Sequence, residues 1–138
     1  MSDAFTKPVP RPTPDTQPYW DGLARGQLLI QRCKSCGSFR HYPRPVCPAC
    51  WSMDHEWVAA SGQGTVHSWT VAHHPFHLGF KAESPYVLLT VDLAEGVRAM
   101  GQLRGLDPAA LRLGLPVEVD FVREGEGPTL PVFRPATA

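Results

Sequence analysis

All four cysteines of the chain lie in one stretch, as the pairs Cys33–Cys36 and Cys47–Cys50. Each pair has the spacing C-x2-C, and ten residues separate the two pairs. A C-x2-C pair forms a tight loop whose backbone N–H groups point at thiolate sulfurs, and two such loops complete a tetrahedron of ligands. Zinc suits four thiolates because it is redox-inert and imposes no geometry of its own. Four filled positions leave none for water, so the spacing predicts a structural zinc site and not a catalytic one.

Two disulfides, a redox-active pair and bound iron are the alternatives for these four residues. The first residues, MSDAFTKPVPRPTPD, lack the apolar core of a secretory signal, so we expect a cytoplasmic protein. Disulfides are rare in that compartment. A redox C-x2-C is typically one motif beside a βαβ unit, whereas here two matched pairs occur. These observations favour zinc over the alternatives.

A second group of chemically active residues lies in one segment: His73, His74, Phe76, His77 and Phe80. The histidines can supply a general base or a second metal site. However, Pro75 interrupts them, and no acidic residue follows before Glu83. A loop that binds a partner or ligand is the simpler interpretation. Its phenylalanines are large apolar side chains for a loop without a binding role, and an acyl chain or a partner surface would cover them.

Arg40 and Arg44 lie between the two cysteine pairs, where guanidinium groups can bind the phosphates of a CoA molecule. Ordinary solvated charges are the alternative interpretation. The chain has no glycine-rich phosphate loop and no serine in a nucleophile-elbow context. The sequence therefore contains no self-sufficient active site, and we expect a protein that is not an enzyme on its own.

The composition limits the partners of this 138-residue chain, in which 13 basic residues balance 13 acidic ones. Zero net charge argues against nucleic acid and against anionic membranes, because neutralising phosphates needs a basic surplus. The longest apolar runs are too short to span a bilayer. Fifteen prolines disfavour long helices. We therefore expect a small protein, rich in strands and loops, that binds neither nucleic acid nor membranes.

The elements that position these residues fall into five segments. Residues 1–14 form a proline-rich arm, which is either flexible or ordered by a partner. Residues 15–27 form a short helix, whose Tyr19 and Trp20 pack on the same chain or on a partner. Residues 28–61 hold the cysteines between two strands, and a glycine pair then marks a boundary. Residues 62–135 follow, and 136–138 form a tail.

The sequence pattern of residues 62–135 is typical of a small closed β-barrel. Apolar residues alternate along 86–93, 97–103 and 117–121, and the first of these strands is expected to be buried on both faces. A tight connection at 94–96 and a capped helical turn at 107–111 separate the strands. Four or five strands with one helical interruption favour a closed barrel over a two-sheet sandwich.

Several motifs agree with one known family in order and spacing: PYWDGLARGQLLIQRCKSCG, PRPVCPAC, EWVAASGQGTVHSWTV, LGLPVEVDF and LPVFRP. On these motifs the chain, from Pro18 to Pro135, resembles the zinc-ribbon/OB-fold accessory proteins associated with acyl-CoA metabolism. The resemblance implies a mainly β protein with an N-terminal helical segment, a rubredoxin-like zinc ribbon and an OB-fold barrel. It also implies zinc ligation by the family's four ligand positions, here Cys33, Cys36, Cys47 and Cys50.

The resemblance implies that the chain is a non-catalytic companion subunit of a thiolase-like enzyme. Such enzymes catalyse acyl transfer, condensation or retro-aldol cleavage of CoA thioesters, including those of steroid side chains. The companion would help to form the acyl-CoA site and contact the thioester or the partner through Tyr19, Trp20, Arg40, Arg44, His73, His74, Phe76, His77 and Phe80. The histidine-rich loop departs from the family pattern.

Two alternative functions stay open at this point. The first is a companion of a hot-dog-fold enoyl-CoA hydratase, which differs only in the partner. The second is of another class, a single-stranded nucleic-acid binder, because ribbons and OB-folds often bind such strands. In that case His67, Trp69 and Phe121 would stack on bases, although the neutral charge argues against it.

Overall fold

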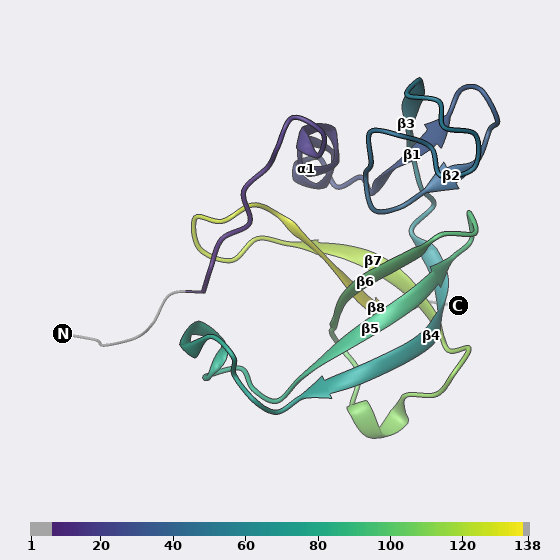
Figure 1. The fold of residues 1–138 in the computed structure, drawn as a ribbon. Helices are drawn as coiled ribbons and strands as arrows, with labels where there is room; N and C mark the ends of the chain where they lie inside the picture. The colour runs from purple at the N-terminus through teal and green to yellow at the C-terminus, as the bar shows by residue number, and fades with distance from the viewer. Residues whose placement is uncertain (1–6, 137–138) are drawn as a thin grey trace.

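The computed structural model describes residues 7–136, so residues 1–6 of the predicted arm and 137–138 of the predicted tail lie outside the described part. A helix and a small three-stranded sheet precede a barrel (Figure 1). The elements in chain order are α1 (Gln17–Ala24), β1 (Leu29–Cys33), β2 (Phe39–Arg40), β3 (His55–Ala59), β4 (Gln63–Ala72), η1 (Leu78–Phe80), β5 (Tyr86–Leu93), β6 (Arg98–Leu103), η2 (Pro108–Ala110), β7 (Pro116–Val122) and β8 (Leu130–Pro135).

The helix α1, Gln17–Ala24, lies within the predicted segment 15–27 and is shorter than it. Pro18 lies in its first turn, where the missing N–H costs nothing. Gly26 follows the last turn with a φ of 73°, the left-handed conformation that terminates helices. In the part of the chain that the structure describes, neither α1 nor any other helix has the length and apolarity needed to cross a membrane.

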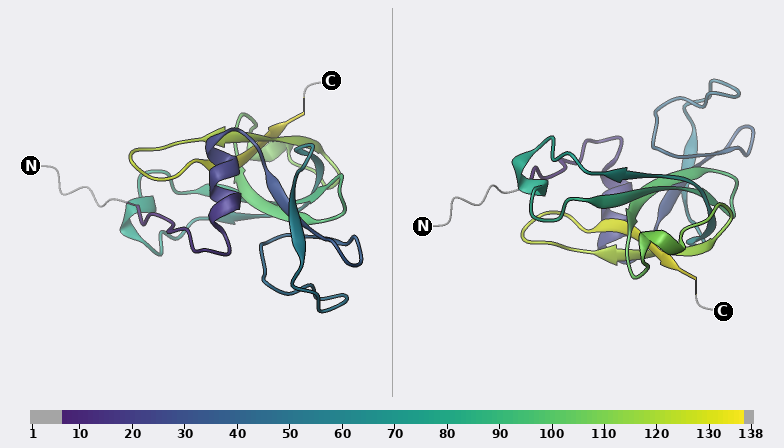
Figure 2. Two further views of the ribbon diagram at one scale, coloured as in Figure 1. Left: turned by 90° about the horizontal axis from the view of Figure 1, so that it is seen from above. Right: turned by 90° about the horizontal axis from the view of Figure 1, so that it is seen from below.

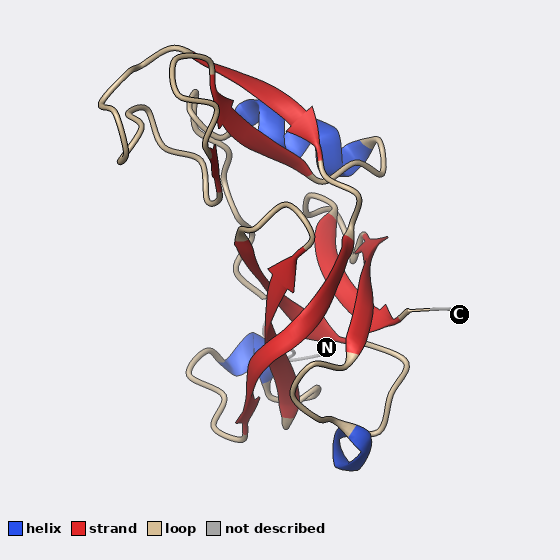
Figure 3. Cartoon of the chain, turned by 90° about the vertical axis from the view of Figure 1, so that its right-hand side faces the viewer, coloured by secondary structure: helices blue, strands red, loops and turns tan. Residues whose placement is uncertain are grey.

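Cys33 is the last residue of β1 in the small sheet, and the other three cysteines lie in the loops between its strands. The strand order is β2-β1-β3, and both pairings are antiparallel. The sheet forms a lobe that projects beyond one end of the barrel (Figure 3). The two cysteine loops follow β1 and precede β3, so the central strand and its longer neighbour position them. The expected rubredoxin-like arrangement is confirmed.

Five strands close the barrel in the order β4-β5-β6-β8-β7, with β4 and β7 joined by the pair Gly64↔Val117. This confirms the expected OB-like barrel. β8 pairs with β7 in antiparallel and with β6 in parallel orientation. Its sequence begins Leu130-Pro131 and ends at Pro135. Because prolines are unusual within a strand, the alternation of apolar and polar residues does not reveal β8 in the sequence.

One apolar core joins the barrel to the helix. In β5 the odd positions are buried and the even positions are half-buried, so the expectation of burial on both faces is wrong. The even face is therefore only partly shielded from solvent. Tyr19 and Leu23 of α1 belong to the same buried cluster as Leu89, Val117 and Phe133 of the barrel. The helix therefore packs on the barrel (Figure 1).

A hydrogen bond also connects the ribbon lobe to strand β6 of the barrel. The backbone N–H of Met100 on β6 donates to the hydroxyl of Tyr42, at 3.0 Å. Tyr42 lies in the segment between the cysteine loops, beside His41. The views from above and below in Figure 2 show the lobe on one side of the barrel and the arm on the other.

Candidate functional site

The four cysteine sulfurs form a compact group whose members all lie within 4.8 Å of one another. Cys33 Sγ and Cys50 Sγ are 3.5 Å apart, and Cys36 Sγ and Cys47 Sγ are 3.7 Å apart. Tetrahedral zinc with Zn–S bonds of about 2.3 Å holds its sulfurs about 3.8 Å apart. These spacings exceed the length of a disulfide and fit a tetrahedron, so the group suits zinc. In the described residues it is the only cluster of three or more such metal-ligating side chains.

The two cysteine loops have the same backbone design. The N–H of Cys33 donates to the carbonyl of Ser38, and the N–H of Gly37 donates back to that of Cys33, both at 2.9 Å. The second loop, CPACWS, repeats both bonds between Cys47, Trp51 and Ser52 at 2.9 Å. The repeat places the ligands symmetrically about one point.

Comparison of the two loops also points to one unusual residue, Trp51. The position after the second cysteine of each loop has a left-handed φ, 79° at Gly37 and 70° at Trp51. Glycine adopts this conformation freely, whereas another residue is strained there. Trp51 is 83% exposed, and its neighbour Met53 is 69% exposed. A strained backbone therefore holds an indole in solvent at the metal site. Comparing the two loops in the sequence would have revealed this residue.

The shifted pKa values of two thiols show why the four cysteines need a bound cation. The Ser38 hydroxyl and then the Ser38 backbone lower the pKa of Cys36 to about 6. At Cys50 the backbone N–H of Ser52 favours the thiolate, but hydrogen bonds with Cys33, burial and the other cysteines outweigh it and raise the pKa to about 12. Thiolates this close repel one another, so a divalent cation is required to hold all four ionised.

Arg40 is a structural residue of the ribbon. Its side chain is buried, and its Nε donates to Gln31 Oε1 at 2.7 Å. Its Nη2 donates to the carbonyl of Arg44 at 2.9 Å. Gln31 Oε1 also accepts from the Arg44 backbone N–H at 2.8 Å. The guanidinium of Arg40 thus fixes the segment between the loops and is not free to bind CoA phosphates, whereas the Arg44 side chain is exposed.

The two aromatic residues of α1 pack on their own chain. Tyr19 is 6% exposed, and burial raises the pKa of its hydroxyl, so the side chain is not offered to a ligand or partner. Trp20 is partly buried against the same core. The ring of Tyr19 lies 5.5 Å from that of His41, whose pKa burial lowers to about 4. His41 is therefore a neutral packing residue between helix and ribbon.

The histidine-rich loop does not assemble a metal site. His77 Nδ1 accepts the backbone N–H of Gly79 at 2.9 Å and thereby caps η1. The rings of His74 and Phe76 contact each other edge to face at 4.6 Å, and Phe76 is 95% exposed. Phe80 packs on Tyr86 at 5.6 Å. His73 is exposed at the end of β4. The loop presents aromatic surface and no assembled catalytic group.

Comparison with known proteins explains this combination. Residues 20–56 match the family model "ChsH2, rubredoxin-like zinc ribbon domain", and residues 57–122 match "ChsH2, C-terminal OB-fold domain". The chain belongs to the ChsH2-type DUF35 family. Its four cysteines are thus the zinc site of a zinc ribbon. The models meet at 56/57, before the β3–β4 connection that holds the predicted boundary 61/62.

The chain is similar to relatives that carry different names. The chain is 42% identical over 94% of its length to a "Probable enoyl-CoA hydratase alpha subunit" of Thermomonospora curvata, of which it spans 40%. A "DUF35 domain-containing scaffold protein" of Methanocaldococcus jannaschii is 34% identical, over 70% of this chain and 68% of that protein. A "Benzoylsuccinyl-CoA thiolase subunit BbsA" of Geobacter metallireducens is 35% identical, over 54% and 48%.

A solved structure is similar over almost the whole chain. It is titled "Ltp2-ChsH2(DUF35) aldolase", and the matching chain is 41% identical with a TM-score of 0.84. The match covers 93% of this chain and 99% of that one. By contrast, the chain spans only about two fifths of the hydratase alpha subunit. The matching chain of the solved structure therefore corresponds over nearly all of its length to the ribbon and barrel described above.

Proposed function

We propose that the chain is a non-catalytic accessory subunit that binds a thiolase-like enzyme and helps to form its acyl-CoA site. The observation that carries the proposal is the exposed Trp51, which a strained backbone holds at the metal site. Strain of this kind persists where function requires the side chain. Exposed tryptophans are also the side chains that most often anchor protein interfaces.

The absence of assembled catalytic groups in residues 7–136 supports an accessory role. No hydrogen bond there joins a serine, threonine or cysteine side chain to a histidine, as a nucleophile and its base would require. The four cysteines fill a metal's positions and leave none for a substrate. The chemistry must then come from another protein.

The names of the relatives support the class of that partner. One is a thiolase subunit, one is a scaffold protein, and one is the DUF35 chain of an aldolase structure. In our proposal the CoA thioester binds at the interface, where Trp20, Arg44 and the exposed side chains of the 73–80 loop remain candidate contacts. The partner's reaction is acyl transfer, condensation or retro-aldol cleavage.

Companionship with an enoyl-CoA hydratase is the second candidate. It is favoured by the 42% identity to a hydratase alpha subunit, which covers nearly all of this chain. Hydration would again be catalysed outside this chain. Both candidates place the same ribbon and barrel beside an acyl-CoA enzyme and differ in the partner's fold.

Co-expression with thiolase-like and with hot-dog-fold proteins encoded beside this chain tests the proposal. We expect co-elution with the thiolase-like protein in size-exclusion chromatography. Trp51→Asn should weaken the complex at least about tenfold, because asparagine tolerates the left-handed backbone but removes the indole. Leu113→Asn is the matched control, since Leu113 is 68% exposed on the barrel, and should leave binding unchanged. Separate elution of the two wild-type proteins would contradict the proposal.

A further inference from the structure

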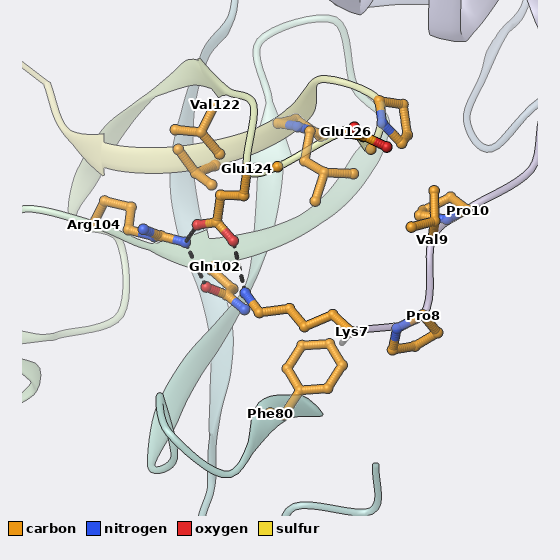
Figure 4. A pocket seen from close by; sticks show the side chains of 16 residues that line it. Lys7, Pro8, Val9, Pro10, Phe80, Gln102, Arg104, Val122, Glu124 and Glu126 are labelled. Atoms are coloured by element: carbon orange, nitrogen blue, oxygen red, sulfur yellow. Dashed lines mark hydrogen bonds and ion pairs between the residues drawn. The ribbon is translucent and has the colours of Figure 1, made fainter. Parts of the chain in front are cut away.

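The N-terminal arm runs on the side of the molecule away from the zinc ribbon (Figure 1), and its residues form part of the wall of a cavity (Figure 4). Residues 7–10, Phe80 of η1 and the β7–β8 hairpin surround a space of about 770 Å³. Small-molecule sites typically measure about 300–1,000 Å³. The space is therefore of a size that holds one small molecule, and nothing in the proposed function uses it.

Most of the cavity wall is apolar. The lining side chains of this kind include Pro8, Val9, Pro10, Phe80, Val122 and Leu130. The two prolines carry no backbone N–H, so they add no main-chain donor to the lining. Proline also restricts the arm to an extended form, which lowers the entropy lost when it closes over a ligand.

Lys7, Arg104 and Glu124 meet at one end of the cavity, and Glu126 lies apart from them (Figure 4). Lys7 Nζ is 2.7 Å from Glu124 Oε2 and 3.0 Å from Glu83, and it lies 5.4 Å from the centre of the Phe80 ring. This ammonium group thus connects the arm, the η1 segment and the hairpin. Arg104 Nη2 is 3.1 Å from Glu124 Oε1 and donates to Gln102 Oε1 at 3.0 Å.

The balance of these charges selects against anions. Both cations at this end already have carboxylate partners, and Glu126 adds a further carboxylate to the lining. A carboxylate or phosphate entering here would meet acidic groups, and among the described lining residues it would find no unpaired cation. An uncharged ligand meets no such repulsion, and its apolar body would be covered by the remaining wall.

We propose that this cavity binds an uncharged, hydrophobic small molecule whose polar end faces Gln102 and Arg104. The arm forms one wall of the site, and Lys7 holds it closed. The inference is independent of the proposed function, because the site consists of residues of this chain alone and needs no partner.

Fluorescence titration of the full chain with N-phenyl-1-naphthylamine, an uncharged hydrophobic probe, tests the site. Val9→Asp should weaken probe binding at least about tenfold, because it adds a charge to the apolar wall. Val9 is half-exposed on the arm, so this variant leaves the barrel core intact. Val46→Asp makes the same change at an exposed valine of the ribbon and should leave binding unaltered.

Two further measurements make the test decisive. Val122→Trp should weaken probe binding by narrowing the space, with zinc content and thermal unfolding showing that the fold is kept. At pH 8, 1-decanol should displace the probe at a concentration at least about tenfold lower than decanoate. Failure of the wild-type chain to bind the probe would overturn the proposal. Full binding by both Val9→Asp and Val122→Trp, or equal displacement by alcohol and carboxylate, would overturn it as well.

Discussion

The zinc ribbon and the barrel are stabilised in different ways, although they are consecutive in one short chain. The ribbon buries few aliphatic side chains, chiefly Leu28 and Ile30, and its interior also holds Gln31 and Arg40. The barrel core consists of aliphatic and aromatic residues from all five strands. A sheet with a two-residue strand and a polar interior needs the metal, whereas a closed barrel does not. The metal thus stabilises the lobe that carries Trp51.

Removal of the metal should give the largest difference between the two regions, because the ribbon should unfold and the barrel should stay folded. Cys33→Ser is expected to reduce zinc from about one ion per chain to almost none, because a structural site needs all four ligands. Structural zinc contributes about 10–16 kcal/mol in small zinc domains, so the ribbon should unfold. Amide NMR spectra should lose the dispersed signals of 28–59 and keep those of β4 to β8. Loss of the barrel signals as well would show that the two regions are not distinct in this way.

Truncation of a core side chain in the barrel should have the opposite effect: it should destabilise the barrel and leave the zinc site intact. Phe133 is fully buried between β6 and β7, so Phe133→Ala should lower the free energy of unfolding by about 3–5 kcal/mol. Zinc content, measured by plasma mass spectrometry under native conditions, should stay at the wild-type level because no ligand contacts this strand. A variant that folds but loses zinc would contradict the separation.

Acid should weaken the joint between the two regions. Burial lowers the pKa of His41 from 6.5 to about 4, so the unfolded chain binds a proton at higher pH than the folded chain. The stabilisation from neutral His41 is complete above pH 6.5 and is lost as the pH falls toward 4, by up to about 1.4 kcal/mol per pH unit. Urea unfolding of the wild type and of His41→Gln should show a flatter pH dependence in the variant. If the free energy of unfolding has the same pH dependence in both proteins, His41 does not contribute to the contact between the two regions.

The smallest predicted effect compares the two cysteine loops. Trp51→Gly should raise the free energy of unfolding of the ribbon by about 1 kcal/mol, because it relieves the left-handed strain. Gly37→Ala should lower it by a similar amount, since the added methyl meets nothing closer than Arg32 Nη2 at 3.8 Å and only the backbone is strained. Thermal unfolding of both variants checks the signs. Equal effects of the same sign would remove the argument that Trp51 is kept for function.

The sequence predicted what depends on local spacing. The C-x2-C pairs fixed the metal ligands, the alternation of Val87 to Leu93 gave a barrel strand, and Asp107 capped η2 by accepting the N–H of Ala109. It did not predict the burial of Arg40, since the partner that fixes Arg40 is a glutamine on another strand. Lys7 and Glu124 are 117 residues apart, so no local pattern reveals that they meet.

The most direct test of the proposed accessory role is the activity of the thiolase-like partner on its CoA thioester, measured with and without this chain. We expect the partner alone to have little activity, full activity on adding the wild-type chain, and little recovery with Trp51→Asn. This chain alone should turn over no substrate. Full activity of the partner in the absence of this chain, or turnover by this chain alone, would contradict the proposal.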